Sequence, residues 1–173
     1  MIIQTPWFER SFSFDFPPGL FPVIFSRLEG SMFRLHALLR NADDEFCSSA
    51  ANGWSIKQHI GHLHDLEELW WKRLKDFTEG KEVLTAADLN NTKTKEAKHN
   101  ESTLEQLLLR FTTERQKLLE TVYSFDHIYL SRTSIHPRLN QSMRLVDSLY
   151  FVAEHDDHHI AIISNMLRKP SDL

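Results

Sequence analysis

Apolar residues recur every three or four positions in four stretches of the chain, whereas strand-like alternation is short and rare. This spacing predicts amphipathic helices that each bury one face. The predicted helices cover about 21–41, about 55–77, a stretch that opens at 102 and runs through 122, and about 142–168. Long connections separate them, so the pattern predicts an all-α four-helix bundle with crossover connections.

The second predicted helix has clear ends. Ser55 and Gln58 fit a capping box, in which each side chain binds the backbone N–H of the other residue. Trp54 and His59 occupy the two positions of a hydrophobic staple around this start. Gly80 follows the apolar pattern and marks the end of the helix.

The remaining segments are less regular. Ser102 and Glu105 fit a second capping box at the start of the third helix. Residues 81–100 are polar without a sustained period and are expected to form a long surface connection, and 124–141 to form another irregular one. Aromatic and polar side chains alternate over 7–16, which predicts that residues 1–17 form a short extended arm that folds onto the bundle.

The composition is that of an ordinary globular protein, with 41% hydrophobic and 25% charged residues. The length predicts one domain, residues 1–173. A net charge of -4, with scattered Lys and Arg, argues against nucleic-acid binding. The apolar runs are too short for a membrane span, residues 1–20 do not resemble a secretory signal, and Cys47 is the only cysteine. We therefore expect a cytoplasmic protein without a disulfide framework.

The ten histidines are the main oddity of the composition, and three of them lie within five residues. His155 and His159 are one helical turn apart and fall on the apolar face of the last helix, about 40° apart on a helical wheel. Two neutral imidazoles in an apolar interior need a partner, and a metal ion is one such partner. His158 falls about 90° from the centre of that face, near its edge.

A third ligand is expected from the second helix. His62 shares its face with the apolar positions, His64 points away from it, and His59 is already explained by the staple position. We therefore favour His62. Three histidines leave a coordination position open, as in catalytic rather than structural zinc sites. The residues between His155 and His159 do not form the H-E-x-x-H motif of zincins.

Simpler readings compete with this metal site. A single inward histidine is more often a hydrogen-bonded core residue than a ligand. Glu154 and Asp157 fall on the outer face of the last helix, where solvation explains them. Asp65, one turn after His62, could orient an imidazole or lie at the surface. The aromatic pair Trp70 and Trp71 could line a pocket or pack in a core.

Three motifs, taken in order, resemble the DinB/YfiT-like superfamily of four-helix metalloproteins. One opens the second helix, one leads into the last helix, and one lies within the last helix. They read Trp54-Ser55-Ile-Lys-Gln-His-Ile-Gly-His62-Leu63, His136-Pro137-Arg138 followed by Met143-Arg-Leu-Val-Asp-Ser-Leu149, and Glu154-His155-Asp-Asp-His158-His159-Ile-Ala-Ile-Ile163. With the number and spacing of the helices, the resemblance covers most of the chain.

The resemblance implies an up-down-down-up bundle, frequent homodimers and a metal ion held by His62, His155 and His159. It also implies one of two kinds of activity, because characterised relatives include S-transferases and isomerases that use low-molecular-weight thiols, and others are described as metal-dependent hydrolases. The stretch 160–162 reads Ile-Ala-Ile, where Arg-Gly-Gln is commoner, and is closer to the YfiT-like branch.

These observations predict a metal-dependent enzyme that acts on a small molecule, as a thiol-dependent S-transferase or isomerase or as a hydrolase. The expected cofactor is one divalent ion, and zinc and nickel both suit imidazole ligands. His158 is the candidate proton-transfer residue. Two alternatives stay open: a stress-related protein that binds a metal or ligand without turnover, and a structural dimer with a vestigial site.

Overall fold

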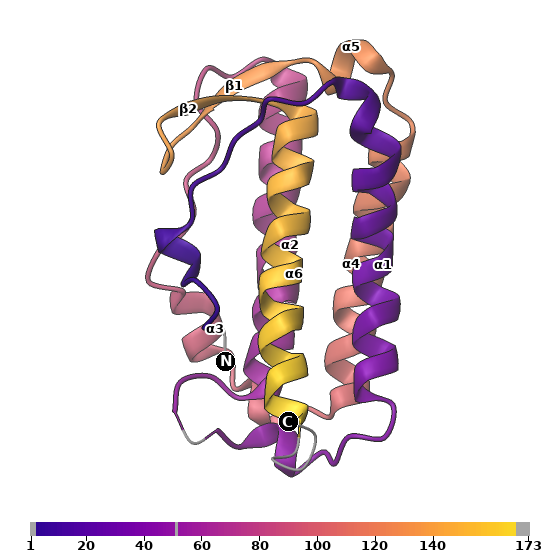
Figure 1. Cartoon of the computed structure of the whole chain (residues 1–173), viewed down its shortest axis with the longest axis vertical. Coiled ribbons are helices and arrows are strands. Elements are labelled where there is room, and N and C mark those ends of the chain that lie inside the picture. The colour runs from indigo at the N-terminus through magenta and orange to yellow at the C-terminus, as the bar shows by residue number, and fades with distance from the viewer. Residues whose placement is uncertain (1–2, 51, 169–173) are drawn as a thin grey trace.

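The computed structural model describes residues 3–50 and 52–168. Four long helices lie side by side as a bundle, and each buries an apolar face in a shared core (Figure 1). They are α1 (Phe21–Leu39), α2 (Ile56–Glu79), α4 (Leu104–Tyr123) and α6 (Leu145–Leu167). Among the helices of the described residues, none combines the length and the apolar character needed to cross a membrane.

The order of directions in the bundle is up-down-down-up. α1 packs against α4 and α6, and α2 packs against the same two helices. Figure 1 shows that α1 and α6 run one way while α2 and α4 run the other. The neighbours α1 and α6 are therefore parallel, and so are the neighbours α2 and α4. Because α2 and α4 are consecutive long helices, the connection between them must return along the bundle. The predicted fold class is confirmed, and α2 faces α6 in opposite direction.

The predicted ends of α2 are confirmed. The Ser55 hydroxyl accepts from the Gln58 N–H, and the Gln58 side chain accepts from the Ser55 N–H at 2.9 Å. Gly80 has a φ of 70°, in the left-handed region that glycine adopts most easily, and ends the helix. Trp54 packs on His59, with 5.5 Å between their ring centroids, as expected of staple positions.

The start predicted for the third long helix was wrong by one residue. The N-cap of α4 is Thr103, whose hydroxyl accepts from the Gln106 N–H while the Gln106 side chain accepts from the Thr103 N–H. Ser102 is not the cap because its N–H binds the carbonyl of His99, which closes the short 3-10 helix η4 (His99–Glu101).

The prediction of irregular structure over 124–141 was also wrong. This connection contains α5 (His127–Leu130) and a hairpin of β1 (Thr133–His136) and β2 (Gln141–Arg144). β2 occupies the residues expected to begin the last helix, so α6 begins at Leu145 instead of 142. The strands have four residues each and depend on pairing with each other, which local periodicity does not reveal.

The connection 81–100 is more ordered than its polar composition suggested. It contains α3 (Thr92–Glu96) and leads into η4. Its start pairs with the hairpin, since the Leu84 N–H donates to the Ile135 carbonyl at 3.0 Å. Most of its residues are exposed, as expected of a surface connection, but Leu84, Thr94 and His99 are buried and tie the segment to the bundle.

The N-terminal arm, in its described part, folds onto the bundle as predicted. Its aromatic side chains pack against α6, and the centroids of Trp7 and Phe12 lie 5.0 and 4.9 Å from that of Phe151. One short 3-10 helix, η1 (Trp7–Glu9), interrupts the extended arm. Arg144 anchors it by donating to the carbonyls at 14 and 16. The arm thereby places Trp7 beside the middle of α6.

Candidate metal centre

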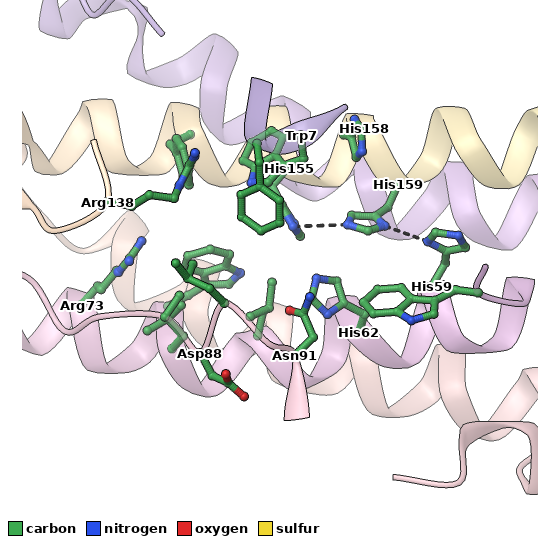
Figure 2. A pocket seen from close by; sticks show the side chains of 18 of the residues that line it. Trp7, His59, His62, Arg73, Asp88, Asn91, Arg138, His155, His158 and His159 are labelled. Atoms are coloured by element: carbon green, nitrogen blue, oxygen red, sulfur yellow. Dashed lines mark hydrogen bonds between the residues drawn. The ribbon is translucent and has the colours of Figure 1, made fainter. Parts of the chain in front are cut away.

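A pocket of about 250 Å³ lies between α2 and α6. The N-terminal arm, the connection 81–100 and the β hairpin complete its walls. Figure 2 shows histidine side chains at one end and two arginines at the other. The part of the lining between these ends is apolar, and includes Leu66, Leu69, Trp70 and Phe151. The pocket therefore joins a group of potential metal ligands to a cationic end through an apolar section.

Three buried histidines meet at one end of this pocket. One ring nitrogen from each of His62, His155 and His159 lies within 4.8 Å of those from the other two. The Nε2 atoms of His155 and His159 lie 3.2 Å apart. The i,i+4 spacing on α6 gives these two a common face, and His62 faces them from α2. The structure thus brings together the three histidines expected from the sequence.

A chain of buried hydrogen bonds fixes the ring of His62. The Thr94 hydroxyl donates to Asp65 Oδ2 at 2.9 Å, and His62 Nδ1 lies 3.1 Å from the same hydroxyl oxygen. Because the hydroxyl has given its one proton to Asp65, the oxygen accepts from His62 Nδ1–H. The lone pair of His62 is therefore on Nε2, and such partners commonly fix the tautomer of metal-binding histidines.

Asp65 also binds His99, whose Nε2 lies 2.9 Å from the same carboxylate oxygen. Burial alone would raise the pKa of Asp65, but the hydrogen bonds from His99 and Thr94 hold it below its ordinary value. The carboxylate therefore stays charged. Gly61 makes this contact possible, since a Cβ at that position would overlap the ring of His99. Of the two roles left open for Asp65, the structure supports orientation of an imidazole.

His159 has its own partner on α2. Its Nδ1 lies 2.9 Å from Nδ1 of His59, and both rings are buried. Trp54 stacks on His159 at a centroid distance of 6.3 Å and also packs on His59. The staple position explained only part of the role of His59, because its ring also holds His159 in place.

Burial keeps these imidazoles neutral. It lowers the pKa of His62 and of His59 to about 4, and it lowers the pKa of His155 and His159 well below the ordinary value of 6.5. The ring nitrogens therefore keep their lone pairs at neutral pH. His155 Nδ1 is buried and has no hydrogen-bond partner among the described residues.

The donor set fits one divalent metal ion. Neutral imidazole nitrogen is a ligand that zinc, nickel and other transition ions accept. Two nitrogens bound tetrahedrally to zinc at about 2.0–2.1 Å lie about 3.3 Å apart, close to the separation found between His155 and His159. Three such ligands could hold an ion and leave its remaining position facing the pocket. That they bind one stays a prediction.

His158 lies at the edge of the same group, as expected. Its Nδ1 accepts from the Gln4 amide at 2.8 Å, and its ring packs at right angles to that of His159 with 5.3 Å between centroids. With Nδ1 occupied as an acceptor, the proton is on Nε2. The ring lines the pocket and is half-buried, and burial lowers its pKa.

The opposite end of the pocket holds Arg73, Arg138 and His136. Arg73 Nη1 lies 3.0 Å from His136 Nε2, and Arg73 Nε donates to the Thr85 carbonyl at 3.0 Å. The pKa of His136 falls to about 3 because of burial and the nearby charges of Arg73 and Arg138. Sequence reasoning assigned no role to these residues, although His136 and Arg138 lie in one of the motifs noted above.

Four other sequence expectations have clear outcomes. The expectation of solvation for Glu154 and Asp157 was wrong: Glu154 pairs with Arg10 and Arg27, and Asp157 pairs with Arg27. The reason is that α1 and the arm cover this side of α6. Trp70 lines the pocket, whereas Trp71 packs partly buried against the core. His64 is not among the residues that line the pocket.

The fold and the sequence of this chain are similar to those of known proteins. The structure of YfiT from Bacillus subtilis, described as a probable metal-dependent hydrolase with an unusual four-helix bundle topology, is similar with a TM-score of 0.77. The similarity covers 91% of each chain at 18% sequence identity, and it concerns the fold. Among curated proteins, no sequence matches the chain. The family model of the DinB superfamily matches residues 27–163, and we conclude that the chain belongs to the DinB superfamily.

Proposed function

We propose that this protein is a metal-dependent enzyme that acts on a small molecule bound in the pocket between α2 and α6. The observation that carries the proposal is the meeting of three neutral, buried imidazoles at one end of a pocket with room for a small molecule. Catalytic metal sites of this kind use three protein ligands and leave a position for water or substrate.

Two reaction classes suit such a site. When bound, the ion would act as a Lewis acid and lower the pKa of a coordinated water or thiol. A hydrolase would use water as its nucleophile, whereas an S-transferase or isomerase would use a low-molecular-weight thiol. Hydrolysis is in line with the description of YfiT, and thiol chemistry with the sequence resemblance to thiol-dependent relatives.

The chain's own residues have separable tasks in this proposal. His62, His155 and His159 hold the ion, with His62 oriented by Thr94. The apolar section of the pocket binds the body of the substrate and excludes water. His158 presents Nε2–H to the pocket, which suits it to donate a hydrogen bond to a substrate oxygen and, once its ring is protonated, to transfer a proton.

The test is a paired activity screen of protein purified without a polyhistidine tag and loaded with zinc or nickel. One arm measures hydrolysis of a panel of small esters and amides. The other measures conjugation of 1-chloro-2,4-dinitrobenzene with cysteine or glutathione by absorbance. We expect turnover in one arm that requires the metal, disappears in His155→Ala and persists in His64→Ala.

Free metal ions at the same concentration provide the background rate. Turnover that is unchanged in His155→Ala would contradict the proposal, because the ion would then act elsewhere. Stoichiometric metal binding without turnover in either arm would favour the alternative of a protein that binds a metal or ligand without catalysis.

A further inference from the structure

The end of the pocket opposite the histidines has two guanidinium groups and no carboxylate paired with them. Arg73 is 2% exposed, and Arg138 is half-buried with its Nη2 atom buried and without a hydrogen-bond partner among the described residues. In the described part of the chain, neither arginine forms an ion pair. Asp76, the acidic residue nearest in sequence, is paired with Lys81.

A buried guanidinium without a counter-ion is costly, and elsewhere this chain avoids it. Arg115, which is fully buried, binds carboxylates from Glu67 and Asp156. Arg73 instead binds one carbonyl and the neutral ring of His136. Burial lowers the pKa of Arg73 to about 10 against the charge of Asp76, which acts on Arg73 without forming an ion pair with it, so the group still carries its charge at neutral pH. Two cations thus face a pocket that supplies neither with an anion.

Asp88, an acidic residue in the lining of the pocket, does not pair with either arginine. The Asp88 carboxylate accepts from the backbone N–H groups of Asn90 and Thr92 at 2.9 and 2.7 Å, which is its own local turn. Figure 2 shows it at the lower rim, apart from Arg138. The side chains around Arg138 are the aromatic rings of Phe8 and Phe151, whose centroids lie 5.5 and 5.7 Å from its guanidinium carbon.

We propose that Arg73 and Arg138 bind the carboxylate of a substrate that has an apolar body and whose reacting group lies at the three-histidine end. This inference deepens the proposed function and rests on it for the role of the histidine end. A carboxylate suits the site because guanidinium groups bind it with charge-assisted hydrogen bonds in a fork geometry. His136 is neutral, so no third cation is present to favour a phosphate dianion.

The probe for the test is 3-phenylpropionate, which joins a phenyl ring to one carboxylate. The neutral 3-phenylpropanol has the same body, and phenyl phosphate supplies the competing anion. Trp7, Trp54 and Trp70 line the pocket, so intrinsic fluorescence reports binding to the full-length chain. Each titration is made on the protein as purified and again with EDTA.

We expect 3-phenylpropionate to bind more tightly than the alcohol, with or without EDTA. Arg138→Gln removes a charged donor and should weaken carboxylate binding about tenfold or more, as expected for loss of a charge-assisted hydrogen bond. The alcohol should bind both proteins equally. Arg110→Gln is the matched control, because Arg110 is an exposed arginine on α4 outside the pocket. It removes the same charge and should leave both affinities unchanged.

Three results would overturn the inference. One is equal carboxylate affinity in the wild type and Arg138→Gln, and another is tighter binding of phenyl phosphate than of 3-phenylpropionate. The third is the absence of saturable binding by either anion. Carboxylate binding that EDTA abolishes and Arg138→Gln does not change would place the anion at the metal, which sinks this inference and leaves the proposed function standing. Carboxylate binding that depends on Arg138, in a protein that is unable to hold metal, would support this inference and contradict the proposed function.

Discussion

Two polar clusters lie inside the same bundle and share the helices α2 and α6, to which the charged cluster adds Arg115 from α4. They satisfy their polar groups in different ways. His62 and Glu67 both lie on α2, and His155 is followed directly by Asp156 on α6. The histidine group gathers neutral rings beside a pocket. The charged cluster of Glu67, Arg115 and Asp156 is closed within the core.

Within the charged cluster, Arg115 pairs with both carboxylates, and of the four carboxylate oxygens Glu67 Oε2 is left without a hydrogen-bond partner among the described residues. Arg115 Nε and Nη2 donate to Glu67 Oε1 at 3.0 and 2.7 Å, and its Nη groups also bind Asp156. Burial raises the pKa of Glu67 to about 7 against the opposing charge of Arg115. One cation therefore pairs with two buried carboxylates. Such a cluster joins three helices and does not require a ligand.

The histidine group is built differently. His62 and His159 each have one nitrogen occupied by a protein partner, and the other nitrogen of each ring is directed at the group itself. Neutral rings do not form ion pairs with one another, and the nitrogen atoms that no protein group occupies keep their lone pairs. These lone pairs are suited to bind a metal cation. The contrast is that the charged cluster pairs its ions with one another, whereas the histidine group could hold a metal ion.

The largest expected effect concerns the charged cluster. Arg115→Met leaves two buried carboxylates without a cation and should lower the free energy of unfolding by about 3–5 kcal/mol. Arg110→Met removes an exposed arginine of the same helix and should change it little. Chemical denaturation of both variants provides the measurement. Equal destabilisation by the two changes would mean that the buried pairs contribute nothing.

Removal of the metal should have a smaller effect on stability. An ion that binds only the folded state at 100 times its Kd stabilises by about 2.7 kcal/mol, or about 5–10 °C in Tm for a chain of this size. Excess EDTA should therefore lower the Tm by this order and leave the far-UV helical signal intact at room temperature, because the apolar core is independent of the ion. Loss of helix on chelation would contradict the distinction between the two clusters.

The pH dependence of the metal-free protein tests the neutrality of the histidine group. His62 has a pKa of about 4 when folded and 6.5 in its ordinary state, so unfolding takes up a proton between these values. The contribution of His62 to stability should consequently fall as the pH drops below about 6.5 and level off near pH 4. Between pH 7 and 5 this residue alone accounts for about 2 kcal/mol. Glu67, whose pKa is raised to about 7, contributes with the opposite sign, so EDTA-treated wild type is compared with EDTA-treated His62→Ala by thermal unfolding at several pH values. A wild type whose stability falls no more steeply toward pH 5 than that of His62→Ala would refute the burial argument.

The smallest effect is expected from the hydrogen-bond chain behind His62. Thr94→Val removes the hydroxyl that accepts from His62 Nδ1 and should weaken metal affinity about tenfold, or 1.4 kcal/mol. Thr113→Val, on the exposed face of α4, is the control. Competition with a chromophoric chelator measures both constants. Unchanged affinity in Thr94→Val would show that His62 needs no support from the connection 81–100.

The sequence predicts the features that depend on local periodicity. The i,i+4 pair His155 and His159, the inward position of His62 and the capping box at Ser55 all follow from helical geometry within one or two turns. The four-helix architecture follows from the same signal repeated along the chain. The bounds of α2 differ from the prediction at its C-terminal end by only two residues.

The features that the sequence does not predict depend on contacts between distant segments. Thr94 and His99 lie in a polar stretch without period, and they become buried because that stretch returns along the bundle to Asp65. Arg73 and Arg138 come from a helix and a hairpin turn that meet only in the folded chain. The one local hint is Gly61, a glycine in mid-helix that leaves space for His99.

The most direct measurement of the central claim is the metal content of the purified chain. Wild type, His62→Ala, His155→Ala, His159→Ala and His64→Ala are prepared without a polyhistidine tag and analysed by elemental mass spectrometry after dialysis against zinc or nickel. We expect one ion per chain in the wild type and in His64→Ala, and loss of bound metal in the other three. A His155→Ala protein that still holds one tightly bound ion would contradict the three-histidine site.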